Sequence, residues 1–185
     1  MTDIHDAPQA DEPLHYEQWA ALIKVQADST AALAAFKVMA RARSLRPNDE
    51  LPFQRAHHPT LGTGRPIAVQ IDLTEPRGDH DHCLFKSDED EDGRKYAGQR
   101  RPHDYLPDRA ERIGFIPQTL LDPDDIYQEK DKPWRLHYIC RTGPKEYFVV
   151  ILHKREKGEP RYSLRTAYPC SSFNHKKLKL LLHRR

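Results

Sequence analysis

The chain has 185 residues, a length that allows one ordinary domain with an extension and is too short for two large domains. Its charge is divided, because residues 1–93 carry 9 Lys and Arg against 17 Asp and Glu, whereas residues 94–185 carry 21 against 11. The chain contains no run of 18 apolar residues, and its acidic start lacks the features of a signal peptide. We therefore expect a cytoplasmic protein with no membrane partner.

The three cysteines, Cys83, Cys140 and Cys170, are odd in number and lack CxxC spacing. This pattern argues against a disulfide framework and against a zinc ribbon, and we expect the protein to need no cofactor.

Residues 1–13 are acidic and contain two prolines, which predicts a disordered start. From residue 14 to residue 46, apolar residues recur at helical spacing through an Ala-rich run, which predicts one long helix or two. Arginines in the last turn suit the negative end of the helix dipole.

The chain then becomes loop-like over residues 47–65, and the alternation in Pro66–Leu73 predicts a strand. Asp79–Gly93 contains five consecutive acidic residues that repel one another, which predicts a solvated, mobile loop. We expect a domain boundary in this loop, between a helical, acidic region, 14–93, and a basic domain, 94–185.

The basic domain opens with a short helical segment that Asp108 is suited to cap. Leu120–Tyr127 contains an Asp-Pro turn and continues as another short helix or an extended piece. Leucines at helical spacing among lysines and arginines predict a short basic amphipathic helix over Asn174–Arg185, whose leucines cover the sheet.

Three strands are predicted between these helical segments: Trp134–Arg141, Glu146–His153 and Arg161–Tyr168. Short connections imply antiparallel neighbours. In the third strand, Arg161, Ser163 and Arg165 are expected on one face, opposite Tyr162, Leu164, Thr166 and Tyr168. The predicted fold class is α+β, with helices packed on a small antiparallel β-sheet and an N-terminal helical extension.

The order of these segments resembles that of the phage-type BECR nucleases, which include barnase, EndoU, colicin E5/D and RelE-like toxins. The resemblance covers about residues 100–172 and is carried by a helix with Arg109 or Arg112, the pattern T-L-x-D-P-D-x-I over Thr119–Ile126, and a strand ending in Thr-Ala-Tyr-Pro. The chain differs from the family at the helical segment, where His103 precedes Arg109 by six residues.

The resemblance implies an endoribonuclease that cuts RNA without a metal and acts as a toxin or effector. It also implies a neutralising immunity or antitoxin protein as a partner.

Cleavage of RNA without a metal requires a base for the 2′-hydroxyl, an acid for the leaving oxygen and cations for the charge on phosphorus. Histidine suits the first two roles and arginine the third. The candidate catalytic residues are His103, Arg109, His137, Arg165, Thr166 and Tyr168. The candidate nucleic-acid-binding residues are Arg100, Arg101, Arg135, Lys154 and Arg161.

Other interpretations of these residues stay open. Thr166 and Tyr168 also suit a strand packed on the core, and His137 and His153 also suit a surface position. His80, His82 and Cys83 have side chains that zinc accepts, but no second matching group accompanies them in the sequence. The basic excess also fits a non-catalytic accessory protein of a phage or mobile element, which binds a nucleic acid or a protein.

Overall fold

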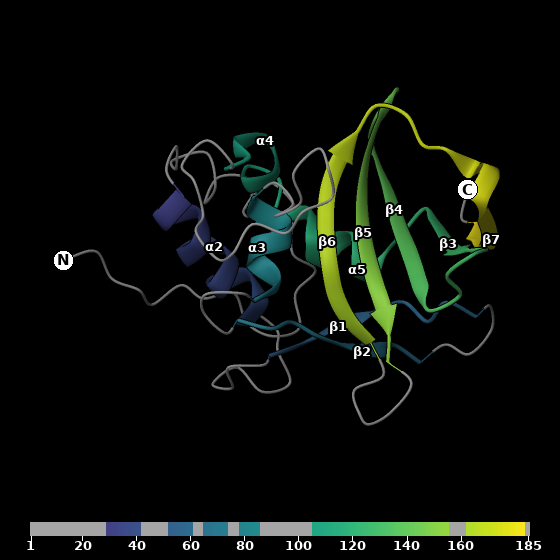
Figure 1. Ribbon diagram of the computed structural model, residues 1–185, viewed down its shortest axis with the longest axis horizontal. Coiled ribbons are helices and arrows are strands. Elements are labelled where there is room, and N and C mark those ends of the chain that lie inside the picture. Colours follow the sequence, from purple (N-terminus) through teal and green to yellow (C-terminus); the bar gives the residue numbers. More distant parts are fainter. Residues whose placement is uncertain are drawn as a thin grey trace.

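The computed structural model describes residues 29–41, 52–60, 65–73, 78–85, 105–155 and 162–183. In this described part, seven strands form one mixed sheet in the order β1-β2-β6-β5-β4-β3-β7, and the sheet curls like half of a barrel (Figure 1). The strands are β1 (Phe53–Ala56), β2 (Ile67–Gln70), β3 (Asp125–Glu129), β4 (Arg135–Gly143), β5 (Glu146–Lys154), β6 (Tyr162–Cys170) and β7 (Leu178–His183). The helices are α2 (Ser29–Arg41), α3 (Asp79–Leu84), α4 (Pro107–Ala110), α5 (Phe115–Leu121) and a 3-10 turn, η2 (His175–Lys177).

The predicted fold class is wrong, because the sheet is larger than expected and is not purely antiparallel. β2 runs parallel to β6 and pairs Val69 with Tyr162 and Gln70 with Ser163. The region expected to be a helical extension therefore supplies two strands. Alternation identified β2 as a strand, but it carries no information about the direction of the partner strand.

β1 lies in the segment that was expected to be a loop, and it joins α2 to the sheet. The amide of Gln54 donates to the carbonyls of Met39 (3.2 Å) and Ala40 (2.8 Å). These carbonyls belong to the last turn of α2, where no further helical turn follows to satisfy them. The part of the predicted helix before Ser29 lies outside the described residues.

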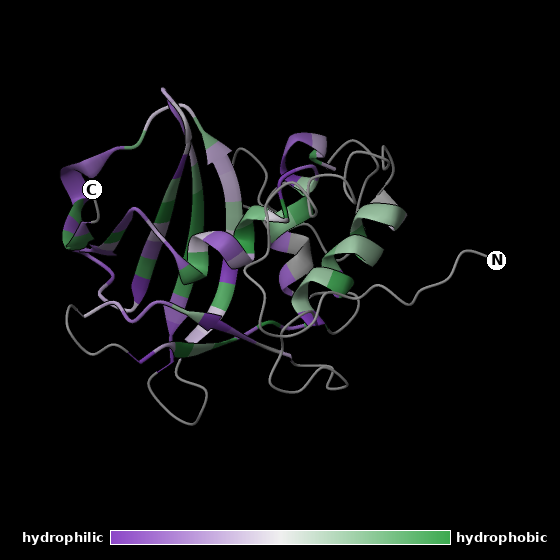
Figure 2. Cartoon of the chain, turned by 180° about the vertical axis from the view of Figure 1, so that it is seen from behind, coloured by the Kyte–Doolittle hydropathy of each residue, from purple (hydrophilic) through white to green (hydrophobic). Residues whose placement is uncertain are grey.

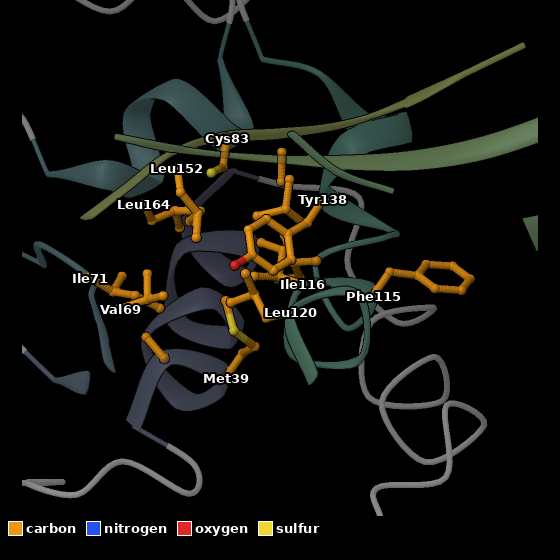
Figure 3. Packing of buried hydrophobic residues seen from close by; sticks show 14 of the residues in the cluster. Met39, Val69, Ile71, Cys83, Phe115, Ile116, Leu120, Tyr138, Leu152 and Leu164 are labelled. Atoms are coloured by element: carbon orange, nitrogen blue, oxygen red, sulfur yellow. The ribbon is translucent and has the colours of Figure 1, made fainter. Parts of the chain in front are cut away.

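One face of the sheet packs against the helices and forms the main hydrophobic core. Figure 3 shows Tyr138 of β4 among Leu120 and Ile116 of α5, with Met39 of α2 beside them. The hydroxyl of Tyr138 donates to the carbonyl of His57, 2.7 Å away. The strands are banded with hydrophobic and hydrophilic residues, whereas α2 is mostly hydrophobic (Figure 2).

β4, β5 and β6 confirm the three strands that the sequence predicts, but β6 contains a bulge. Leu152 pairs with Leu164 and Ile151 with Thr166, so Arg165 is an extra residue without a partner in the ladder. Because of the bulge, Leu164 lies in the main core while Thr166 and Tyr168 lie on the opposite face. The expected common face of Leu164, Thr166 and Tyr168 is therefore wrong.

The predicted C-terminal helix is also wrong, because Leu178–His183 forms the edge strand β7, which pairs antiparallel with β3. Asp79–Leu84, expected to belong to a mobile loop, forms α3 with Cys83 and Leu84 buried in the core. α4 begins after Leu106 without a side-chain cap, so Asp108 does not cap it.

The face of the sheet opposite the main core carries a second, smaller cluster, and we call this the outer face. Its buried members are Tyr127, Ile139, Val149 and Ile151. Tyr168 and Phe173 pack against them from β6 and from the segment that joins β6 to β7. The outer face is where charged and aromatic side chains meet.

Candidate active site

α3 lies beside the part of β6 that does not pair with β2 (Figure 1). β2 pairs with β6 only at Tyr162 and Ser163, so the remainder of that side of β6 can meet a helix. The carbonyl of His82 in α3 accepts hydrogen bonds from the hydroxyl of Thr166 (2.6 Å) and from the guanidinium of Arg109 (3.3 Å). These contacts hold α3, α4 and β6 together.

The side chain of His82 makes a separate contact with Arg165. One guanidinium nitrogen of Arg165 lies 2.8 Å from Nε2 of His82. Because a guanidinium has no lone pair to offer, Nε2 of His82 must accept this hydrogen bond. The imidazole in this arrangement is therefore neutral, with its proton on Nδ1 and a lone pair facing an exposed arginine.

Arg109 and Tyr168 complete this group of side chains, which we call the His82 cluster: His82, Arg109, Arg165, Thr166 and Tyr168. The guanidinium carbon of Arg109 lies 5.4 Å from the centre of the Tyr168 ring, within the range of a cation–π contact. Burial raises the pKa of Tyr168, so its phenol keeps its proton at neutral pH.

A second group lies on the outer face across β3, β4 and β5, and we call it the Glu129 cluster: Glu129, Arg135, His137 and His153. The carboxylate of Glu129 lies 3.3 Å from the guanidinium of Arg135 and 3.5 Å from Nε2 of His137. The second distance is too long for a well-formed hydrogen bond. Arg135 also donates through Nε to Nε2 of His153, 3.2 Å away.

The two histidines of the Glu129 cluster are held in their neutral form. Burial lowers the pKa of His153 to about 4, and the charges of Arg135 and Arg165 lower it further in the same direction. Burial also lowers the pKa of His137, although the neighbouring Glu129 opposes this effect. His153 is therefore uncharged at neutral pH.

The two clusters are adjacent on the outer face. His153 pairs with Ser163 of β6 on one side and with Arg135 of β4 on the other. The charges of Arg109 in the His82 cluster and of Arg135 in the Glu129 cluster both act on the pKa of Tyr168, so Tyr168 is close to both clusters. Ile151 of β5 pairs with His137 of β4 on one side and with Thr166 of β6 on the other. The backbones of His137 and Thr166 are therefore two strand spacings, about 10 Å, apart.

Asp79, the first residue of α3, is a largely buried acid next to the His82 cluster. Its carboxylate accepts a hydrogen bond from the backbone N–H of Asp72, 2.7 Å away. Burial raises the pKa of Asp79 to about 7, while the charges of Arg165 and Arg155 oppose this shift. The charge on α3 therefore changes near neutral pH.

The structure brings together four of the predicted catalytic residues: Arg109, Arg165, Thr166 and Tyr168. His137 lies in the neighbouring Glu129 cluster with Arg135, and Lys154 is exposed at the end of β5. His103, Arg100, Arg101 and Arg161 lie outside the described residues.

Sequence reasoning missed His82 and Glu129 as site residues. His82 was considered only as a metal ligand, because its contacts with β6 depend on the folding of Asp79–Leu84 as a helix. Glu129 lacks any sequence signal, since its partners come from other strands.

Among the described residues, no three or more His, Cys, Asp or Glu side chains are grouped so that they could hold a metal ion. Burial raises the pKa of Cys83, so this thiol keeps its proton. The described part of the chain also contains no helix that is long and apolar enough to cross a membrane. Comparison with protein-family models, with curated proteins and with solved structures finds no match to this chain.

Proposed function

We propose that this protein is a metal-independent endoribonuclease whose reacting groups are the His82 cluster. The observation that carries the proposal is the 2.8 Å contact between a guanidinium nitrogen of Arg165 and Nε2 of His82. Because a guanidinium can only donate, this contact requires a neutral imidazole that accepts through Nε2. The cluster combines an imidazole lone pair that can accept the proton of a 2′-hydroxyl, hydroxyls that can protonate a leaving oxygen and guanidinium groups that can hold the charge on phosphorus.

In the proposed reaction, Nε2 of His82 takes the proton from the 2′-hydroxyl of the ribose. The 2′-oxygen then forms a bond to phosphorus, and the bond from phosphorus to the 5′-oxygen breaks. The leaving 5′-oxygen takes a proton from Tyr168, whose raised pKa keeps its phenol protonated. The products are a 2′,3′-cyclic phosphate and a 5′-hydroxyl end.

The arginines bind the phosphate and prepare the base. Arg165 is exposed, so an RNA phosphate can draw its guanidinium away from His82 and free the Nε2 lone pair. Arg109 is held against Tyr168 and stabilises the charge that develops on phosphorus. We assign the reacting phosphate to this cluster because the charge of Arg135 is already paired with Glu129.

The role as a toxin or effector rests on the resemblance of the Thr119–Ile126 pattern to the BECR nucleases. That role implies an immunity or antitoxin protein that covers the site. The basic excess of residues 94–185 supports RNA as the substrate, because neutralised phosphates release counterions.

The test is incubation of the protein with total RNA in excess chelator. We expect the His82→Ala variant to cut about 100- to 10,000-fold more slowly than the parent, because it lacks the base. The Arg165→Ala variant loses a phosphate contact and is expected to slow by about 100-fold or more. Arg55→Ala, a matched control on the far edge strand β1, is expected to match the parent.

The alternative function is a non-catalytic protein that binds a nucleic acid or a protein. One observation favours it, because the lone pair that catalysis needs is occupied by Arg165 in this structure. A parent that binds RNA with a salt-dependent affinity but leaves it intact would support this alternative. Cleavage that is equal in the parent and in His82→Ala would remove the His82 cluster as the reacting site.

A further inference from the structure

A small recess lies on the outer face beyond the Glu129 cluster, where β3, β4 and β7 meet the segment that follows β6. Its volume is about 250 Å³, and its lining includes Asp125, Tyr127, Arg141, Tyr147, Phe173 and His175. Ligand sites for larger molecules usually begin at about 300 Å³, so this recess suits one planar ring system. Neither of the clusters described above accounts for it.

The recess has aromatic walls. Tyr127 lies 5.5 Å from Phe173 and 5.3 Å from His175, measured between ring centres. Phe173 and His175 are 5.1 Å apart and meet edge to face. His175 is exposed and Phe173 is half-buried, so these rings remain accessible from solvent.

Polar groups with opposite hydrogen-bonding character border the same recess. The carboxylate of Asp125 is buried and bonded to His183 at 2.5 Å, whereas the guanidinium of Arg141 is exposed. A carboxylate accepts and a guanidinium donates, so together they complement the edge of a ring that carries both donors and acceptors.

The recess is continuous with the charged part of the outer face. The ring of Phe173 lies 6.1 Å from that of His137, and Tyr127 pairs with His137 in the sheet. Glu129 follows Tyr127 by two residues on the same face of β3, about 7 Å along the strand. A ligand ring in the recess therefore lies next to the Glu129 cluster, on the same face of the sheet as the His82 cluster.

We propose that this recess binds one nucleobase of single-stranded RNA, as a subsite on the same face of the sheet as the bond that is cut. The identification of RNA as the ligand rests on the proposed function. Unpaired bases stack on aromatic side chains and expose the edges that Asp125 and Arg141 complement. The subsite places the strand across β3 and β4 while its phosphate reaches the His82 cluster on β6.

The test uses fluorescent 2′-O-methyl tetranucleotides, one for each base, and an abasic backbone of the same length. These probes lack a free 2′-hydroxyl, so binding is measured without cleavage. We expect the parent to bind at least one base-containing probe about 5- to 100-fold more tightly than the abasic probe. We expect Phe173→Ala and His175→Ala to lose this preference for base-containing probes. Lys179→Ala, an exposed control on β7, is expected to keep it.

Equal affinity of the parent for all base-containing and abasic probes would overturn the subsite. A base preference that is unchanged in both Phe173→Ala and His175→Ala would overturn it too. Because His175 is exposed, its replacement tests the ring without disturbing the core. A parent that cuts RNA without any base preference removes only the subsite, whereas a base preference without cleavage supports the subsite and removes the proposed reaction.

Discussion

The extra residue in β6 decides where the polar groups of this strand lie. Because Arg165 has no partner in the ladder, Thr166 and Tyr168 pass to the outer face and Arg165 reaches His82. Without the bulge, strict alternation would place Thr166 and Tyr168 on the core side with Leu164. β-bulges commonly occur next to active sites and re-aim side chains in this way.

Asp79 provides a prediction at the residue scale. Its pKa is about 7 in the folded protein and about 3.9 in an unfolded chain, because burial disfavours the charged carboxylate. Between these values the folded protein binds more protons than the unfolded chain. The contribution of Asp79 to stability therefore falls as the pH rises from about 4 to about 7. The hydrogen bond from the backbone of Asp72 and the charges of Arg165 and Arg155 lower this pKa, whereas the charge of Asp72 raises it.

Replacing Asp79 with Asn removes the titration and retains an oxygen that can accept from Asp72. We expect the free energy of unfolding of Asp79→Asn minus that of the parent to be roughly 2–3 kcal/mol higher at pH 8 than at pH 5, because only the parent loses stability over this range. Urea denaturation of both proteins at the two pH values measures this difference. An equal difference at both pH values would show that Asp79 does not titrate in this range.

At the scale of elements, the side chain of Gln54 in β1 holds the end of α2. Gln54 is buried and satisfies two carbonyls in the last turn of α2. Replacing it with Ala leaves these carbonyls without their donor, which is expected to lower the free energy of unfolding by about 1–3 kcal/mol.

The neighbouring residue in β1 supplies the control for this experiment. Arg55→Ala changes an exposed side chain and is expected to alter the free energy of unfolding by less than about 0.5 kcal/mol. Urea denaturation of the two variants compares them directly. Equal stabilities would mean that Gln54 does not anchor α2.

The sequence predicted those elements whose pattern is local and missed those that depend on distant partners. β4 and β5 are long, apolar and joined by a tight turn, so their pattern alone identifies them. In the C-terminal segment, Leu178, Leu181 and Leu182 stand at helical spacing. That segment forms a strand because the edge of β3 offers it a ladder of hydrogen bonds.

The residues of the candidate site also fall into those that the sequence suggested and those that it missed. Residue type and motif were enough to name Arg109, Arg165, Thr166 and Tyr168 as candidates, and the structure places them in one group. His82 was not among these candidates, since its position depends on how α3 packs against β6. The bulge at Arg165 has no sequence signal, because an extra residue changes the register without changing the composition of the strand.

On the scale of the whole molecule, residues from both sides of position 94 share one hydrophobic core. Phe36, Val69 and Leu84 lie in the same cluster as Leu152 and Leu164. The long-range contacts between these segments also position α3 against β6.

A fragment that begins at Arg94 is therefore expected not to fold, since it lacks α2, α3, β1 and β2. Circular dichroism should show a cooperative thermal transition in the full chain and none in the fragment. A cooperative transition in the fragment would show that the basic part of the chain forms a core by itself.

The chemistry of the RNA ends tests the central proposal most directly. A synthetic oligonucleotide with one ribonucleotide in a 2′-deoxy chain is incubated with the protein in excess chelator, and the products are analysed by mass spectrometry. Because the attacking group is the neighbouring 2′-hydroxyl, we predict a single cut with a 2′,3′-cyclic phosphate on one product and a 5′-hydroxyl on the other. A product with a 5′-phosphate, or undiminished cleavage by His82→Ala, would contradict the assignment of His82 as the base.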